Sequence, residues 1–198
     1  MARKRKPAVF LDRDGTLIHD VGYLNRFSQI RFYPGVERAL RALKERGFLL
    51  FVVTNQSGVA RGYFPESFVR QTHGKIQSLL KRKGARLDGF FYCPHYPTGK
   101  VKSLAKACDC RKPSPGMVRQ ASRKFALNLK DSFMVGDKLD DLNLAKRAGL
   151  GQGILVKTGK GRKTQEAFSA KERKNTVVAG SMAGAARWIL RHSSEGKK

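Results

Sequence analysis

Acidic residues are scarce in this chain, and five of the 15 gather in two short segments. The first segment reads Leu-Asp-Arg-Asp-Gly-Thr and carries Asp12 and Asp14, and the second carries Asp137, Asp140 and Asp141. Carboxylates that are brought together repel one another, and a hard cation such as Mg²⁺ relieves the repulsion by binding their oxygens. The two segments together therefore predict a magnesium site.

Polar and basic residues that lie between these segments supply donors suited to phosphate oxygens. Residues 54–58 read Thr-Asn-Gln-Ser-Gly and offer hydroxyl, amide and backbone N–H groups, while Arg111 and Lys112 place fixed positive charge before a helix. Carboxylates, a metal ion, small donors and a lysine are the parts that phosphoryl transfer through a carboxylate nucleophile requires. Phosphoryl transfer is therefore the chemistry that we expect.

Some of these acids also have simpler interpretations. Asp12 and Asp14 could form a turn followed by a helix cap. Asp140 could be a helix N-cap, a direct metal ligand, or a residue that orients Lys112 or a metal-bound water. Asp141 is expected to be structural or to lie behind the ligands, and the sequence does not decide which of these two neighbours contacts the metal shell.

A second group of residues has the spacing of a zinc site. Cys93 and His95 are followed, after twelve residues, by Cys108 and Cys110, which uses every cysteine of the chain once. Three thiolates and an imidazole suit a closed tetrahedral Zn²⁺ site, which leaves no position for a substrate water and is therefore structural. Such a site would clamp residues 93–110 and hold the following Arg111 over the active site. The alternative is three free thiols and a surface histidine.

Short apolar runs that end in polar residues alternate with helical patterns along the chain. We expect strands at residues 8–11, 48–53, 132–135 and 153–156, because their continuous apolarity indicates burial on both faces. Helices are expected from residue 34 to 47, from 65 to 82, from 115 to 125, from 142 to 148 and from 182 to 191. This alternation predicts an α/β fold with a doubly wound, mostly parallel sheet, in which ligands bind beyond the carboxyl ends of the strands. Residues 157–174 lack periodicity and are expected to be a basic surface segment.

Length and charge narrow the class of protein. The 198 residues fit a single domain spanning 1–198, and the longest unbroken apolar run, residues 48–53, is far too short to cross a membrane. The basic start of the chain lacks the apolar stretch of a secretory signal, so we expect a cytoplasmic protein. The net charge of +26 first suggests a nucleic acid or another polyanion as partner. The concentration of the few acids in two places favours a cation site instead, and makes nucleic acid an unlikely partner.

Four segments of the chain, taken in sequence order, resemble the four motifs of the haloacid dehalogenase (HAD) superfamily of phosphotransferases. The matching residues are Asp12 to Thr16, then Thr54 with Asn55, then Lys112, then Gly136 and Asp137 with Asp140 and Asp141. The resemblance implies a HAD-like fold without a large cap domain. It also implies that Asp12 is the nucleophile that forms an aspartyl-phosphate, and that Asp14 is the general acid and base.

The same resemblance assigns the remaining roles at the reacting phosphate. Mg²⁺ would be bound by the carboxylates of Asp12 and Asp137 and by the backbone carbonyl of Asp14. Lys112 and Thr54 would stabilise the phosphate oxygens in the transition state.

The zinc-type loop narrows the resemblance to sugar bisphosphate phosphatases of this superfamily that act on a heptose. It implies removal of the 7-phosphate of D-glycero-D-manno-heptose 1,7-bisphosphate in ADP-heptose and lipopolysaccharide core biosynthesis, and we expect the enzyme to be a monomer. The residues expected at the substrate are Asp20, Gly22, Tyr23, Asn55, Gln56, Ser57, Arg111 and Lys138. Three alternatives stay open: a histidinol-phosphate phosphatase, a nucleic-acid 3′-phosphatase, and a polyanion-binding protein without catalysis.

Overall fold

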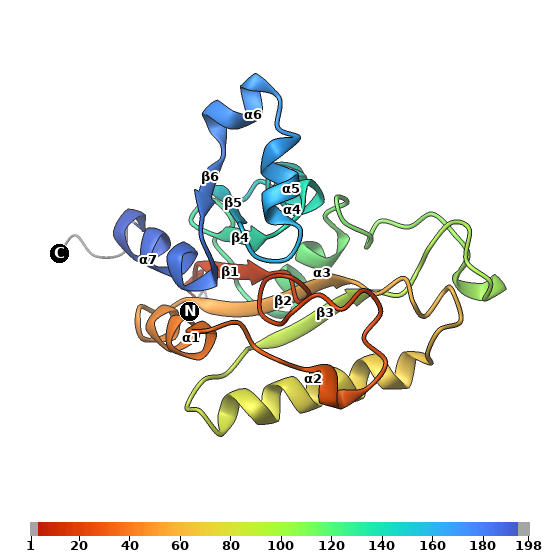
Figure 1. Cartoon of the computed structure of the whole chain (residues 1–198). Helices are drawn as coiled ribbons and strands as arrows, with labels where there is room; N and C mark the ends of the chain where they lie inside the picture. Colours follow the sequence, from red (N-terminus) through yellow and green to blue (C-terminus); the bar gives the residue numbers. More distant parts are fainter. Residues whose placement is uncertain (1–3, 194–198) are drawn as a thin grey trace.

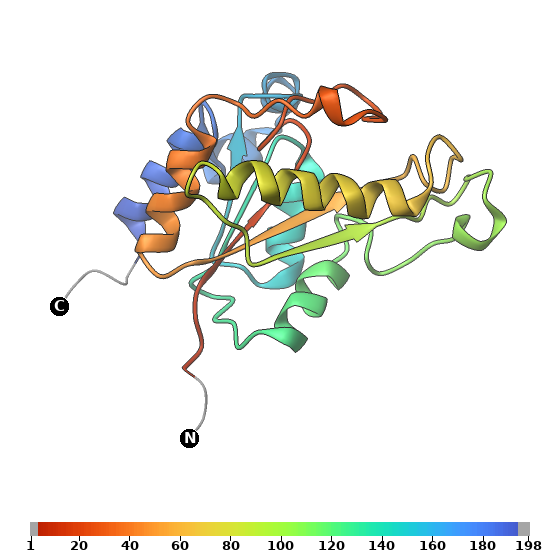
Figure 2. The same ribbon diagram turned by 90° about the horizontal axis from the view of Figure 1, so that it is seen from below.

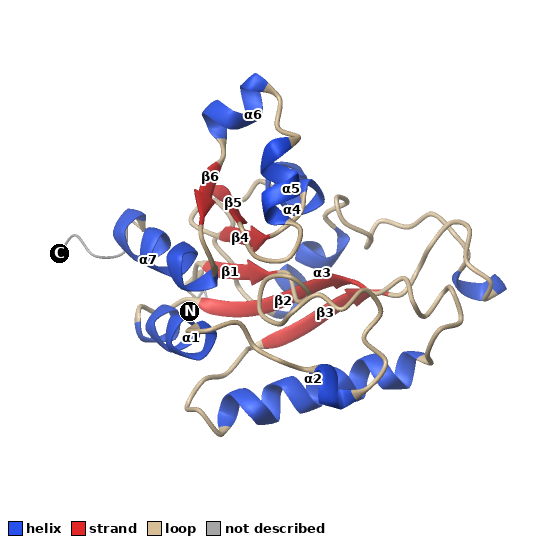
Figure 3. Ribbon diagram, in the orientation of Figure 1, coloured by secondary structure: helices blue, strands red, loops and turns tan. Residues whose placement is uncertain are grey.

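A computed structural model describes residues 4–193, so the two ends of the expected 1–198 domain lie outside the described residues. Six parallel strands form one sheet in the order β3-β2-β1-β4-β5-β6 (Figure 3). The strands are β1 (Ala8–Leu11), β2 (Leu49–Asn55), β3 (Gly89–Cys93), β4 (Phe133–Gly136), β5 (Gln152–Val156) and β6 (Val177–Ala179). The register places Phe10 of β1 beside Phe51 of β2 and Met134 of β4. The expected doubly wound parallel sheet is confirmed.

Helices cover both faces of this sheet (Figures 1 and 2). One face packs against α1 (Val36–Glu45), α2 (Glu66–Lys81) and α7 (Met182–His192), and the other against α3 (Gly116–Lys124) and α4 (Leu139–Ala148). Two short helices, α5 (Gly161–Glu166) and α6 (Ala170–Asn175), connect β5 to β6, and two 3-10 turns, Phe27–Gln29 and Lys102–Leu104, lie in loops. No helix of the described residues is long and apolar enough to cross a membrane.

The central strands are buried on both faces, as their continuous apolar sequence predicts. In β1, Ala8 and Phe10 contribute to the core under α3 and α4, and Val9 and Leu11 to the core under α1 and α7. All four side chains are fully buried. A strand with an alternating apolar and polar sequence could not occupy this place, because its polar side chains would all face one of the two cores.

The order of the strands determines where a ligand can bind. After β1 the chain builds β2 and β3 on one side, and then returns to build β4, β5 and β6 on the other side. The loops that leave β1 and β4 therefore diverge and open a crevice at the carboxyl end of the sheet, the usual ligand site in such folds. Asp12 follows β1 directly and Asp137 follows β4, so both acidic segments meet at this crevice.

Two strands and two helices were not expected from the sequence. No strand was predicted at β3, and β6 has only three half-buried residues. Residues 157–174 lie mostly at the surface, as expected, but they form the short helices α5 and α6 and a turn before them that reaches the crevice. These elements were not predicted because their positions depend on hydrogen bonds to distant parts of the chain, which leave no periodic pattern in the local sequence.

Candidate active site and metal centres

Three buried carboxylates meet at the end of the sheet. Asp12 and Asp137 follow their strands, and Asp141 comes from the first turn of α4. One carboxylate oxygen of each residue lies within 4.8 Å of the others. All three side chains are nearly or fully excluded from solvent. Three acids in so small a volume need positive charge beside them, because burial strengthens their mutual repulsion.

The environment of Asp137 fits a cation. Its Oδ2 accepts a hydrogen bond from the Lys160 backbone N–H at 2.8 Å, while its buried Oδ1 has no hydrogen-bond partner and lies 4.0 Å from Lys138 Nζ. Burial, together with the charge of Asp12, raises the pKa of Asp137 to about 7. A buried carboxylate oxygen without a hydrogen bond, on a group that resists ionisation, is what a hard cation such as Mg²⁺ would satisfy, since the ion favours the charged form.

Lys112 supplies the fixed positive charge of the cluster. Its Nζ lies 2.7 Å from an oxygen of Asp12 and 2.7 Å from an oxygen of Asp141, and it also donates to the Val53 carbonyl at 2.9 Å. Burial alone would lower the pKa of this ammonium group, but the two carboxylates outweigh that effect and raise it. In return, although burial raises the pKa of Asp12, the charge of Lys112 beside it brings that pKa below its usual value. Asp12 is therefore held ionised, which a nucleophile requires.

Asn55 positions this lysine rather than facing the pocket freely. Its side-chain oxygen accepts the Lys112 backbone N–H at 2.9 Å, and its amide nitrogen donates to the Lys112 carbonyl at 3.2 Å. The end of β2 is thereby tied to the loop that precedes α3. The sequence predicted Asn55 as a substrate-binding residue, whereas its side-chain amide here binds the backbone of the lysine.

The carboxylate of Asp14 is held apart from the three-acid cluster. Arg13 donates to both of its oxygens, with the shortest contact at 2.8 Å, and Gln56 donates to it at 3.0 Å. The same Gln56 amide also donates to the Thr54 hydroxyl at 2.9 Å, and its oxygen accepts from Arg13 at 2.9 Å. Gln56, predicted at the substrate, therefore also orients the predicted acid–base residue.

The structure separates the two neighbours that the sequence left undecided. Asp141 is fully buried, contacts Lys112, and accepts the Lys138 backbone N–H at 3.1 Å. Burial raises the pKa of Asp141 to about 6, although the charge of Lys112 opposes this. Asp140 is exposed and lines the pocket, Lys138 rather than Asp140 is the N-cap of α4, and Lys112 pairs with Asp141, so two of the alternatives for Asp140 are wrong. The helix begins at Leu139, which turns position 141 inward and position 140 outward.

A pocket of about 350 Å³ opens above Asp12. All of the predicted substrate residues line it: Asp20, Gly22, Tyr23, Asn55, Gln56, Ser57, Arg111 and Lys138. The Gly22 backbone N–H donates to the Asp20 carboxylate at 2.8 Å, which shapes the turn beside Tyr23. Five further lining residues were not predicted: Leu24, Arg61, Phe64, Tyr96 and Lys160. They come from loops that are brought together by the fold and share no local motif with the acids.

The turn after β5 is the part of the site that sequence reasoning missed most clearly. Thr158 donates its hydroxyl to the Gly15 carbonyl at 2.6 Å, and Thr164 donates to the Asp137 carbonyl at 2.8 Å. Between them Gly159, at φ +56°, passes so close to Asp137 that a side chain there would meet its carboxylate. This turn therefore braces the first acidic loop and Asp137 from the far side of the cluster.

Cys93, His95, Cys108 and Cys110 come together as the spacing predicted. The Sγ of Cys108 lies 3.5 Å from that of Cys93 and 3.3 Å from that of Cys110, and His95 Nδ1 lies 3.3 Å from Cys110 Sγ and 3.8 Å from Cys93 Sγ. Donors on a tetrahedral zinc ion are about 3.5–3.8 Å apart, whereas a disulfide would need about 2.05 Å. The geometry therefore fits a closed Zn²⁺ site, two residues before Lys112.

Comparison with known proteins agrees with this geometry. Residues 109–185 match the HAD-hydrolase-like family model. Over 156 residues the chain is 50% identical to a D-glycero-beta-D-manno-heptose-1,7-bisphosphate 7-phosphatase of Haemophilus ducreyi, covering 78% of this chain and 85% of the relative. A protein of the same name from Escherichia coli K12 is 46% identical over 157 residues, covering 79% and 82%.

A solved structure gives the same result for the fold. The D,D-heptose 1,7-bisphosphate phosphatase of B. bronchiseptica, crystallised with magnesium and phosphate, aligns with a TM-score of 0.81 at 33% identity, over 94% of this chain and 99% of that one. Buried carboxylates around a lysine, a zinc-type loop beside them, and close relatives of one name lead to one conclusion. The chain belongs to the family of heptose-1,7-bisphosphate 7-phosphatases, within the HAD-like phosphoric monoester hydrolases.

Proposed function

We propose that this chain is a Mg²⁺-dependent phosphatase that removes the 7-phosphate of D-glycero-D-manno-heptose 1,7-bisphosphate, a step in ADP-heptose and lipopolysaccharide core biosynthesis. One observation carries the proposal. The ionised Asp12 lies at the floor of a pocket of about 350 Å³, against Lys112, and the pocket wall carries further basic side chains. A small phosphorylated substrate can therefore place one phosphate on the nucleophile while the rest of it stays in contact with positive charge.

In the first step, a carboxylate oxygen of Asp12 attacks phosphorus, and the bond from phosphorus to the sugar oxygen breaks. Asp14 gives its proton to the departing sugar oxygen, so the sugar leaves as an alcohol and Asp12 carries the phosphoryl group. In the second step, Asp14 takes a proton from a water molecule, which attacks the phosphorus and releases phosphate and free Asp12. The hydrogen bonds from Arg13 and Gln56 support the second step, because they orient the carboxylate of Asp14 that takes the proton.

Lys112 and the Thr54 hydroxyl are proposed to stabilise the charge that develops on the phosphate oxygens. Asp12 and Asp137 would hold Mg²⁺ through their carboxylates, with the backbone carbonyl of Asp14 as a third ligand. When bound, the ion offsets the repulsion between a carboxylate nucleophile and an anionic phosphate. Asp141 would keep Lys112 in place through their ion pair.

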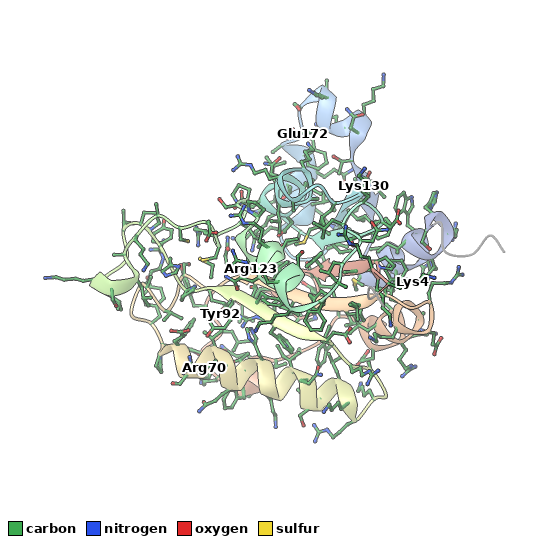
Figure 4. All side chains as sticks on the ribbon, turned by 180° about the vertical axis from the view of Figure 1, so that it is seen from behind. Lys4, Arg70, Tyr92, Arg123, Lys130 and Glu172 are labelled. Atoms are coloured by element: carbon green, nitrogen blue, oxygen red, sulfur yellow. The ribbon has the colours of Figure 1, made fainter. Side chains whose placement is uncertain are left out.

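Arg111 and Lys138 are proposed to meet the second phosphate, and Asp20, Gly22, Tyr23 and Ser57 the sugar. The chain is further proposed to act as a monomeric single domain in the cytoplasm. Nucleic acid is not its substrate on this proposal. In support, the exposed basic residues Lys4, Arg123 and Lys130 lie on separate parts of the molecule in the view from behind (Figure 4).

The test compares three substrates at equal concentration with Mg²⁺: heptose 1,7-bisphosphate, histidinol phosphate, and an oligonucleotide with a 3′-phosphate. The wild-type protein should release phosphate fastest from the heptose, and Asp12→Asn should abolish release while leaving the thermal unfolding transition in place. Faster release of phosphate from histidinol phosphate or from the oligonucleotide would refute the proposed substrate and identify the faster one in its place. Near wild-type activity of Asp12→Asn would refute the mechanism.

A further inference from the structure

Two arginines converge on one tyrosine ring at the wall of the active-site pocket. The guanidinium carbon of Arg61 lies 3.9 Å from the centre of the Tyr96 ring, and that of Arg111 lies 5.1 Å from it. All three residues line the pocket that has Asp12 at its floor. Cation–π contacts of this kind orient a guanidinium group without neutralising its charge, so both arginines keep their positive charge for another partner.

Neither arginine has an acidic partner among residues 4–193. No carboxylate of the described chain lies within 4.0 Å of either guanidinium, whereas Arg13 and Arg119 each pair with an aspartate. The Nε of Arg61 is buried and has no hydrogen-bond partner, and Arg111 makes one long contact of 3.4 Å to the His95 carbonyl. Buried donors of this kind normally have a partner, and a guanidinium fork is matched to a phosphate or a carboxylate.

The arrangement is built by two loops that lie side by side. The loop after β2, residues 56–62, packs against the loop after β3, residues 94–107, in both views (Figures 1 and 2). The Val101 backbone N–H donates to the Ala60 carbonyl at 2.9 Å, and Gly99 approaches so closely that a Cβ there would lie 2.6 Å from the same oxygen. Tyr96 follows the zinc-type ligand His95 directly, so the position of its ring depends on the Cys/His cluster.

We propose that Arg61 is a specificity-determining residue, which binds, together with Arg111 and on the scaffold of Tyr96, the phosphate that the enzyme does not remove. This inference rests on the proposed function and extends it to a residue and a positioning ring outside the catalytic motifs. A bisphosphate brings a second dianion into the pocket. Lys112 is already paired with two carboxylates, whereas Arg61 and Arg111 have no acidic partner among the described residues and keep their charge available.

The experiment compares heptose 1,7-bisphosphate with heptose 7-phosphate, which has the same reacting group but lacks the second phosphate. In Arg61→Met, kcat/KM for the bisphosphate should fall about 10- to 100-fold, the loss expected for charge-assisted hydrogen bonds, while that for the monophosphate stays within about twofold. Arg61→Lys should recover part of the loss. Tyr96→Leu should lose the same preference, and Tyr96→Phe, which keeps the ring, should retain it.

Arg26→Met is the matched control, because Arg26 is exposed nearby but lines a separate depression outside the active-site pocket. A loss that is equal for the two substrates, or equal in Arg26→Met, would overturn the inference. Binding of both sugars, measured by thermal shift with Mg²⁺, separates it from the proposed function. If wild-type protein hydrolyses neither sugar, a binding preference for the bisphosphate that Arg61→Met abolishes still supports the inference. The absence of any such preference overturns it.

Discussion

Replacing Gly159 with alanine tests whether the turn after β5 positions the proposed metal ligand. Gly159 has φ +56°, and its added Cβ would lie 2.5 Å from Gly15 Cα and 3.1 Å from Asp137 Cγ. Neither neighbour can move freely, because Gly15 is backbone and Asp137 is fully buried. We therefore expect the carboxylate of Asp137 to be displaced and its hydrogen bond from the Lys160 N–H to be lost.

Two separate costs follow from this geometry. A left-handed conformation at a residue with a side chain costs about 1–2 kcal/mol of folding free energy. The lost hydrogen bond to a charged carboxylate is worth about 1.5–3 kcal/mol, which corresponds to a Mg²⁺ affinity lower by about 10- to 100-fold. The affinity is measured from the rise in melting temperature with increasing Mg²⁺, since a ligand that binds the folded state stabilises it, and from the Mg²⁺ dependence of phosphate release.

Gly149→Ala is the matched control for the backbone cost. Gly149 also has a positive φ, +68°, at the end of α4, but nothing lies within 4 Å of the Cβ that it would gain. It should lose similar stability and keep the Mg²⁺ affinity of the wild type. If Gly159→Ala binds Mg²⁺ with the affinity of the wild type, the turn does not position Asp137 and the reasoning is refuted.

Three further outcomes are expected. Cys108→Ser should contain no zinc by elemental analysis, melt at a lower temperature and lose its preference for a bisphosphate; a zinc-free preparation with full stability and activity would contradict the clamp. Asp141→Ala should cost about 3–5 kcal/mol in urea unfolding, because it leaves Lys112 with a broken buried ion pair, while Asp140→Ala should change stability by less than about 0.5 kcal/mol. A larger loss of stability in Asp140→Ala than in Asp141→Ala would show that the exposed Asp140 is the structural acid. Random DNA should shift in a gel at low salt and be released near about 0.2 M salt, with phosphatase activity unchanged; binding that survives would indicate a specific nucleic-acid site.

The strands that carry the proposed catalytic acids could be predicted, because a short apolar run is visible in the local sequence. Asp12 and Asp137 each follow a short apolar run that a parallel sheet must bury on both faces, so their meeting at one crevice follows from the topology. The zinc-type cluster could be predicted for a similar reason, since four ligands at this spacing have few other uses. In both cases the residue type and its immediate neighbours carried the information.

The contacts that the sequence could not reveal depend on distant partners or on helical phase. Lys160 reaches Asp137, and Arg61 reaches Tyr96, only because separate loops are folded against one another. Asp140 and Asp141 are chemically identical, and a start of α4 shifted by one residue would exchange their roles. The strand β3 lies at the sheet edge, where its pairing with β2 matters more than its own short sequence.

The arrangement of charges around Asp12 implies an order of binding. Three carboxylates face two ammonium groups, those of Lys112 and Lys138, so the formal charge of the cluster is one negative unit. In that state the floor of the pocket attracts a divalent cation and repels a phosphate dianion. With the cation in place the sign reverses, and the dianion becomes the favoured next ligand. Inorganic phosphate should therefore bind tightly only when Mg²⁺ is present, and calorimetry would measure the same phosphate affinity with and without Mg²⁺ if the charge balance did not govern assembly.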